Sequence, residues 1–134
     1  MARMLPRVNR LLLDLLVPVM APVPFYSQQP DLTRDLPVGM ARKVPGGGAV
    51  DPRFLDRCMV DVQCWHTSDA DADDLAEAAR VALVTAWRTQ QVIGGLGSIS
   101  GYREISSPSL LQQDDTPKGV YRYQATYQLA IRPA

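Results

Sequence analysis

The sequence predicts an α+β fold, an antiparallel sheet of about four strands with two helices packed on one face, plus a proline-rich irregular arm. Three stretches lead to this prediction. Residues 57–65 alternate between apolar and polar side chains, as a strand with one buried face does, and lead into a helical pattern that reaches Arg88. Residues 119–132 alternate still more regularly, and residues 4–17 carry an amphipathic helical stripe. We expect a single domain over residues 1–134.

The first expected element, within residues 1–17, is an amphipathic helix from about Met4 to Val17. Its apolar stripe consists of Leu5, Val8, Leu12 and Leu15. We expect Pro18 to end the helix, because proline lacks a backbone N–H and clashes with the preceding turn. The stretch superficially resembles a signal peptide, but Asp14 interrupts its apolar run and no clear cleavage site follows. The run is also too short, and too interrupted by proline, to span a membrane.

Residues 18–56 form the predicted arm, in which seven prolines fall before residue 53. Such a segment stays mostly extended or irregular, because proline cannot donate to a hydrogen-bond ladder. Its best strand candidate is LPVGMAR at 36–42, and the glycines at 46–48 are expected to form a flexible loop tip. The core then follows at 57–134 as strand, helix, strand and strand.

The second helix is expected to start at a cap among residues 67–69 and to stop near residues 91–94, with two glycines as the break. Aspartates crowd its first turn, where carboxylates favour the positive end of the helix dipole. The face expected to lie on the sheet consists of Leu75, Ala78, Ala79, Ala82 and Ala86, widened by Val81, Val84 and Trp87. Strands at 97–107 and 119–132 are expected to pair around a loop at 107–118.

The composition shows no excess of either charge, because 14 Lys and Arg residues balance 14 Asp and Glu residues. This balance favours neither a nucleic-acid partner nor a basic one, and it is compatible with self-association. Cys58 and Cys64 are six residues apart on one strand, roughly 20 Å, which is too far for a disulfide. We expect both to be buried core residues in a reducing compartment.

Four patterns resemble functional motifs without meeting their requirements. The aspartates of 69–74 are not followed by the glycine and the glutamate that a calcium loop needs. The glycines of 94–101 lie between a helix and a strand, the reverse of the order in a dinucleotide-binding turn. His66 has Ser68 nearby, but Ser68 suits a helix cap and no nucleophile elbow is present. The tyrosines of 121–127 fit core packing better than a base-stacking platform. We therefore assign no catalytic, metal or cofactor residue.

Three segments together resemble the tail terminator proteins of long-tailed, siphovirus-type bacteriophages. VDVQCWHTSDADADDLAEAARVAL resembles the strand, short polar link and Ala-rich helix of that family. GYREISSPSLLQQDDTPKGVYRYQATYQLAIRP resembles its closing hairpin, and LPVGMARKVPGGG its earlier strand and glycine turn. The resemblance covers residues 36–133 and includes no catalytic signature.

The resemblance implies a structural virion protein rather than an enzyme, with no cofactor. Terminators form a hexameric ring at the head-proximal end of the tail tube, stop tube polymerisation and join the tail to the head connector. The implied partners are further copies of the chain, the tail tube protein and the connector protein, with DNA only passing through the lumen and no membrane. The implied location is the tail or neck of the virion, assembled in the host cytoplasm.

A ring built head-to-tail needs two unlike surfaces on each subunit. We expect the loops at 41–56 and 107–118 to supply them. The candidate charged contacts are Arg42, Lys43, Arg53, Asp114, Asp115 and Lys118. Two alternatives remain: another neck component, such as a connector, a stopper or a tube-like subunit, and an unrelated small ligand-binding α+β domain. A tube-like subunit should show a long hairpin, which the sequence does not predict.

Overall fold

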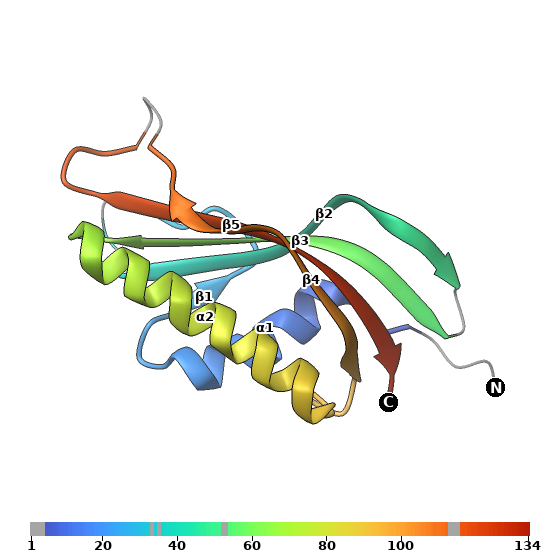
Figure 1. Ribbon diagram of the computed structural model, residues 1–134. Coiled ribbons are helices and arrows are strands. Elements are labelled where there is room, and N and C mark those ends of the chain that lie inside the picture. Colours follow the sequence, from blue (N-terminus) through green and yellow to red (C-terminus); the bar gives the residue numbers. More distant parts are fainter. Residues whose placement is uncertain (1–4, 33, 35, 52–53, 113–115) are drawn as a thin grey trace.

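The computed structural model of the chain describes residues 5–32, 34, 36–51, 54–112 and 116–134. Its elements are α1 (Val8–Met20), β1 (Phe25–Tyr26), β2 (Val38–Asp51), β3 (Leu55–His66), α2 (Asp69–Thr89), β4 (Gly97–Leu110) and β5 (Tyr121–Pro133). The strands form one sheet in the order β1-β2-β3-β5-β4. Figure 1 shows both helices lying against the same face of this sheet. The predicted α+β class with two helices is confirmed.

The sheet has one strand more than expected and is mixed. Strands β2 to β5 pair antiparallel, as predicted, but β1 adds a short parallel edge through the pairing of Phe25 with Gly39. The Gly39 N–H donates to the Pro24 carbonyl at 2.9 Å. A side chain at Gly39 would collide with the buried Phe25 ring, so glycine lets this edge close tightly.

The predicted loop at 41–56 is wrong, because most of it belongs to a long hairpin. β2 runs to Asp51 and β3 begins at Leu55. The glycines interrupt the strand pattern in the sequence, so this part of the strand was not predicted. The structure nevertheless needs a glycine here, because the pairing with β3 shifts register around Gly47, where φ is 102°. A Cβ there would lie 2.7 Å from the Arg57 carbonyl oxygen, so the bulge requires glycine.

The predicted loop at 107–118 is also shorter than expected. β4 continues to Leu110, although Pro108 lies within it. The proline is tolerated because β4 is an edge strand and the register shifts between Ser106 and Ser109. The long pairing of β4 with β5 forms a second extended hairpin.

Helix α1 is displaced along the sequence relative to its prediction. It starts at Val8 rather than near Met4, because Leu5 precedes Pro6 and such a residue disfavours the helical region. It also continues through Pro18 to Met20. Burial of Met20 against the core favours this last turn and offsets the hydrogen bond that Pro18 cannot make.

Helix α2 begins and packs largely as expected. Ser68 is its cap, with the hydroxyl oxygen accepting the Asp71 N–H at 3.1 Å. The helix stops at Thr89, and Gln90 rather than a glycine takes the left-handed conformation. The residues of α2 buried on the sheet are Ala72, Leu75, Ala76, Ala79, Ala82, Leu83 and Ala86. Ala78 and Val81, predicted on this face, are exposed instead.

Candidate protein-interaction surfaces

The sheet presents two chemically different faces. Towards the helices, β3 contributes Cys58, Val60, Val62 and Cys64 and β5 contributes Ala125, Tyr127, Leu129 and Ile131, all in the main core. Because strand side chains alternate, Arg57, Asp61 and Gln63 of β3 lie on the opposite face. We call this side, which carries no helix, the open face (Figure 1).

One end of the open face is covered by a small apolar cluster. It consists of Val38, Met40, Trp65 and Val120, with Leu32 and Leu36 packed against it. Trp65 is completely buried, although it lies on the same face of β3 as Arg57, Asp61 and Gln63. The chain segments before β2 and before β5 supply this cover, so only the remaining part of the open face is available to a partner.

A buried polar network occupies the middle of the open face. Asp61 is 6% exposed, and its two carboxylate oxygens accept hydrogen bonds from the amides of Gln63 at 2.7 Å and Gln124 at 2.8 Å. Arg122 is similarly buried, and it donates to the Leu111 carbonyl at 3.2 Å. Two amides thus satisfy a carboxylate that lies on the side away from the helices.

Beyond this network the open face is basic. The exposed arginines on it are Arg42, Arg57 and Arg103, from β2, β3 and β4. A shallow depression of about 230 Å³ lies between Arg57 and Arg103, with Gly101 and Ala130 as its floor and Gln128 beside it. The sequence reasoning missed this grouping, although the alternation of residues 57–65 placed Arg57 opposite the core.

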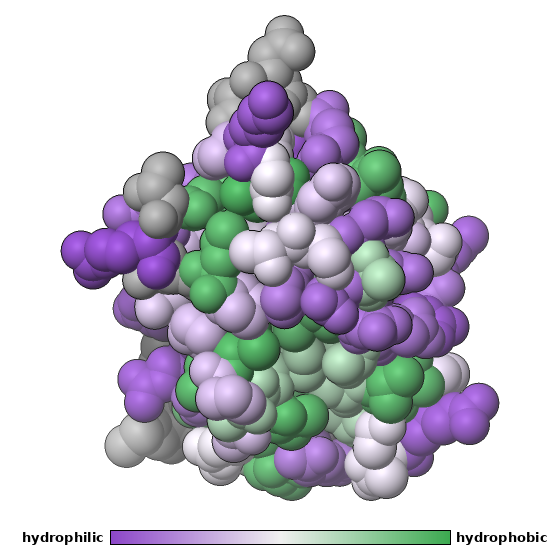
Figure 2. Space-filling view, turned by 90° about the vertical axis from the view of Figure 1, so that its left-hand side faces the viewer, coloured by the Kyte–Doolittle hydropathy of each residue, from purple (hydrophilic) through white to green (hydrophobic). Residues whose placement is uncertain are grey.

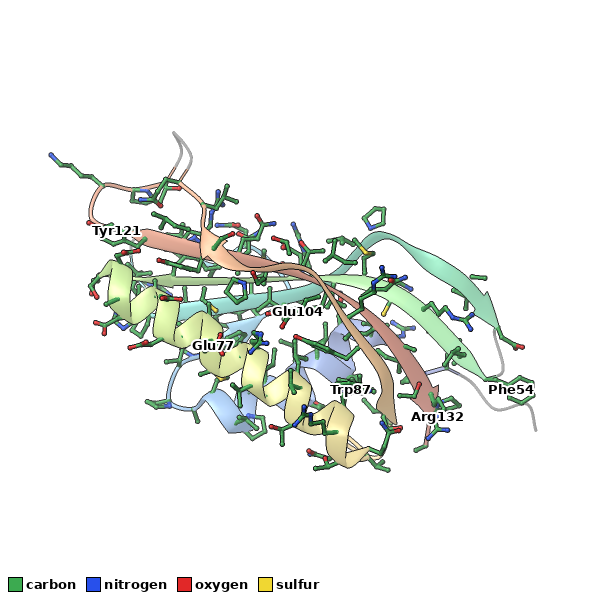
Figure 3. All side chains as sticks on the ribbon, viewed as in Figure 1. Phe54, Glu77, Trp87, Glu104, Tyr121 and Arg132 are labelled. Carbon is green, nitrogen blue, oxygen red and sulfur yellow. The ribbon has the colours of Figure 1, made fainter. Side chains whose placement is uncertain are left out.

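Three of the six predicted contact residues, Arg42, Lys43 and Lys118, lie within the described residues. Arg42 is exposed on the open face, whereas Lys43 points to the helix side, where its Nζ lies 3.3 Å from Asp56 Oδ2. Lys118 is exposed just before β5. Arg53, Asp114 and Asp115 lie outside the described residues. The hairpin tip near Phe54 and the connection before Tyr121 are at opposite ends of the sheet (Figure 3).

On the helix side, a cluster of aromatic and charged side chains connects α2 to the sheet. Trp87, Tyr102 and Tyr127 stack in sequence, with ring centroids 5.5 Å apart at each step. The Tyr102 hydroxyl donates to Glu104 at 2.7 Å, and Arg80 of α2 donates to the same carboxylate. These two hydrogen bonds, from Tyr102 first and then from Arg80, lower the pKa of Glu104 below its usual 4.5. The cluster is structural, because every charged member is paired.

The geometry around the two cysteines and the histidine gives little support for a nucleophilic site or a metal site. Burial raises the pKa of both Cys58 and Cys64 to about 12, so neither is a thiolate at neutral pH. His66 uses its Nδ1 to accept the Thr67 N–H at 2.8 Å, beside the helix cap. Within the described residues, no three His, Cys, Asp or Glu side chains gather closely enough to bind a metal ion.

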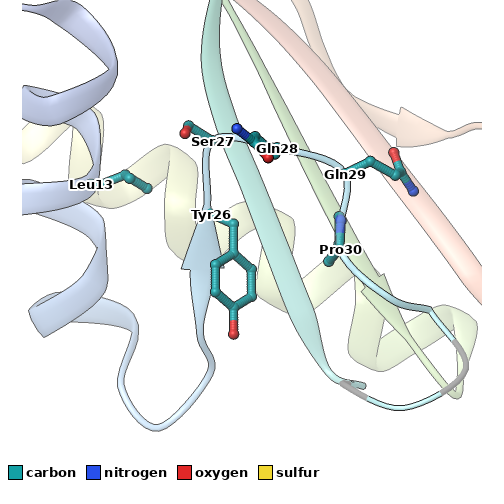
Figure 4. Close-up of a pocket in the computed structure, with 6 residues that line it drawn as sticks. All are labelled: Leu13, Tyr26, Ser27, Gln28, Gln29 and Pro30. Atoms are coloured by element: carbon teal, nitrogen blue, oxygen red, sulfur yellow. The ribbon is translucent and has the colours of Figure 1, made fainter.

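A pocket of about 440 Å³ lies between α1 and the segment after β1 (Figure 4). Its lining is Leu13, Tyr26, Ser27, Gln28, Gln29 and Pro30. These side chains are neutral polar or apolar ones. Figure 2, which views the end where α2 begins, shows hydrophobic surface in its lower half, and the last turns of α1 expose Val17 and Val19.

Fold and surfaces together define a two-layer α+β protein with a free, basic sheet face and two long hairpins. No protein-family model matches the chain, and no curated protein matches it. No helix in the described ranges has both the length and the apolar character needed to cross a membrane.

Proposed function

We propose that this chain is a structural virion protein: a tail terminator that forms a ring at the head-proximal end of a phage tail tube, stops tube polymerisation and joins the tail to the head connector. The role requires neither catalysis nor a cofactor. The resemblance of residues 36–133 to that family supports the proposal, as do the two long hairpins.

The placement of the two hairpins is the observation that carries the proposal. A terminator needs one surface for the tube and another for the connector. The β2–β3 tip lies at one end of the sheet and the β4–β5 connection at the other, separated by the full length of the strands (Figures 1 and 3). A subunit so built can contact unlike partners along the ring axis while its sides contact neighbouring copies.

Native mass and negative-stain imaging of the purified protein, alone and mixed with tail tubes, test this function. We expect rings, or caps at a single end of each tube, and tubes that no longer elongate. Lys118→Glu at one end of the sheet should weaken binding of one partner and leave the other unchanged. A protein that stays monomeric and ignores tubes refutes the proposal.

A tube-like subunit is the second candidate, and the structure favours it more than the sequence did. The sequence predicted no long hairpin, which argued against a tube protein. In the structure, β2 and β3 form a hairpin whose strands have 14 and 12 residues. The same imaging separates the two functions. A tube-like subunit polymerises by itself into long tubes, whereas a terminator binds one end and stops growth.

A further inference from the structure

In the described part of the chain, the three arginines of the open face form no ion pair with a carboxylate. Arg57 donates to the neutral Ala49 carbonyl, at 3.4 Å. No ion pair within the described part of the chain involves Arg42 or Arg103. Asp61, beside them, is buried and already accepts two amide hydrogen bonds. The open face therefore keeps a net positive charge.

The depression between Arg57 and Arg103 can admit a side chain from outside. Gly101 and Ala130 face each other across β4 and β5, and a Cβ on Gly101 would lie only 3.0 Å from the Ala130 Cβ. With no larger side chain on this floor, an incoming carboxylate can reach between the two guanidinium groups. The Gln128 amide on the same wall can donate a further hydrogen bond.

The outward side of α2 has the complementary chemistry. Its first half exposes five carboxylates: Asp69, Asp71, Asp73, Asp74 and Glu77. The nearest cation, Arg80, already pairs with Glu77 and Glu104. Further along the same helix, Val81 is 50% exposed, and Ile105 beside the arginines is also 50% exposed. Each surface thus has charges of one sign together with an apolar side chain.

The two surfaces lie on opposite sides of the molecule, because α2 packs on the face of the sheet that the arginines do not share (Figure 1). Charges so placed cannot neutralise each other within one copy, although the total formal charge is zero. They can do so between copies. We propose that the open face of one copy receives the acidic half of α2 from a second copy, with Asp73 or Asp74 entering the depression between Arg57 and Arg103.

This contact is head-to-tail, because the two surfaces are unlike, so it can extend to a closed ring. The assignment of this contact to a terminator ring rests on the proposed function. The self-association of the chain through these two surfaces does not depend on that function. The chemistry predicts association that weakens as salt rises, since exposed charges are screened within about 8 Å at physiological ionic strength.

A charge-swap experiment with two double variants tests the contact. Arg57→Glu with Arg103→Glu makes the open face acidic, and Asp73→Lys with Asp74→Lys makes α2 basic. Sedimentation at several salt concentrations should show that wild type associates at low salt and that each variant alone associates about tenfold more weakly or not at all. An equimolar mixture should regain the wild-type mass, because each acidic surface then meets a basic one.

Arg7→Glu is the matched control, since Arg7 is an exposed arginine at the start of α1 and belongs to neither surface. It should leave the mass unchanged, and circular dichroism should show all variants folded. Wild type that is monomeric at every salt concentration, or a mixture that fails to recover, overturns the inference. So does a monomer whose open face instead binds nucleic acid. Tube capping that survives both swaps refutes this contact but not the proposed function, and charge-dependent association without capping refutes only the function.

Discussion

Substitution of Asp61 by asparagine should destabilise the fold measurably, although the two side chains have nearly the same shape. Asp61 is 6% exposed and uses both oxygens as acceptors, for Gln63 Nε2 at 2.7 Å and Gln124 Nε2 at 2.8 Å. Asparagine replaces one of these oxygens with an amino group. That group would face an amide donor, so a hydrogen bond forms there only after the Gln124 amide rotates to present its oxygen.

The magnitude follows from those two hydrogen bonds. A hydrogen bond to a charged group contributes about 1.5–3 kcal/mol and one between neutral groups about 1 kcal/mol, so asparagine weakens both bonds even after that rotation. Removal of a buried charge partly offsets this loss. Rotation of the Gln63 amide does not rescue the network, because its Oε1 already lies 3.5 Å from Arg122 Nη1 and the rotated amide would present a donor there. We expect Asp61→Asn to lower the free energy of unfolding by about 2 kcal/mol.

Urea unfolding followed by circular dichroism measures the change, with Gln124→Glu and the double variant as companions. Gln124→Glu alone should be more damaging, because it sets two carboxylates against each other. The double variant should recover stability relative to that single change, since the amide introduced on β3 can then donate to the carboxylate introduced on β5. An Asp61→Asn protein as stable as wild type, or a double variant whose losses simply add, would refute the reasoning.

Three further outcomes follow from the same structure. The stabilising contribution of Glu104, which accepts from Tyr102, should be full above the unfolded-state pKa and vanish as pH falls through the lower folded-state value. Wild type and Glu104→Gln should therefore converge in unfolding free energy below pH 4.5. Cys58 and Cys64 should resist a thiol reagent in native protein and react fully in urea, because both are buried. Gly39→Ala should cost about 1–3 kcal/mol in a thermal or urea melt, since its methyl group would displace a buried phenylalanine ring.

The sequence predicted those elements whose side chains alternate or repeat around a buried face. Residues 57–65 and 119–132 form the central strands β3 and β5, where one face must be apolar because the helices cover it. The apolar stripe of α1 is predictive for the same reason: Val8, Leu12 and Leu15 are all buried. Burial of one face imposes a period on the sequence, and that period can be read without the structure.

Only the start of strand β2 was predicted, by the strand candidate at 36–42, because the pairing of the rest depends on the backbone. Beyond Lys43 it contains Val44, Pro45 and three glycines, with no alternation to read. Its backbone still pairs with β3 through two register shifts. Hairpin closure and bulge geometry, both set by the neighbouring strand, override the low strand propensity of these residues.

The basic open face was hidden for a different reason. Its arginines are at 42, 57 and 103, on three strands, and only the register between strands brings them to one surface. The sequence shows that each alternates away from apolar neighbours, but not that they share a face with a single buried carboxylate. A surface site made of one residue per strand leaves no local motif.

A net charge of zero therefore has a different meaning once the fold is known. Taken from composition, it indicates only that copies of the chain do not repel each other. In the structure, the positive charges of the open face and the negative charges of α2 lie on opposite sides of two packed layers. Since salt screens exposed charges beyond about 8 Å, these surfaces attract strongly only when two copies come into contact in one orientation. A total charge of zero, arranged in this way, thus favours association of copies in one orientation. Only the arrangement of the strands distinguishes this chain from one whose copies neither attract nor repel each other.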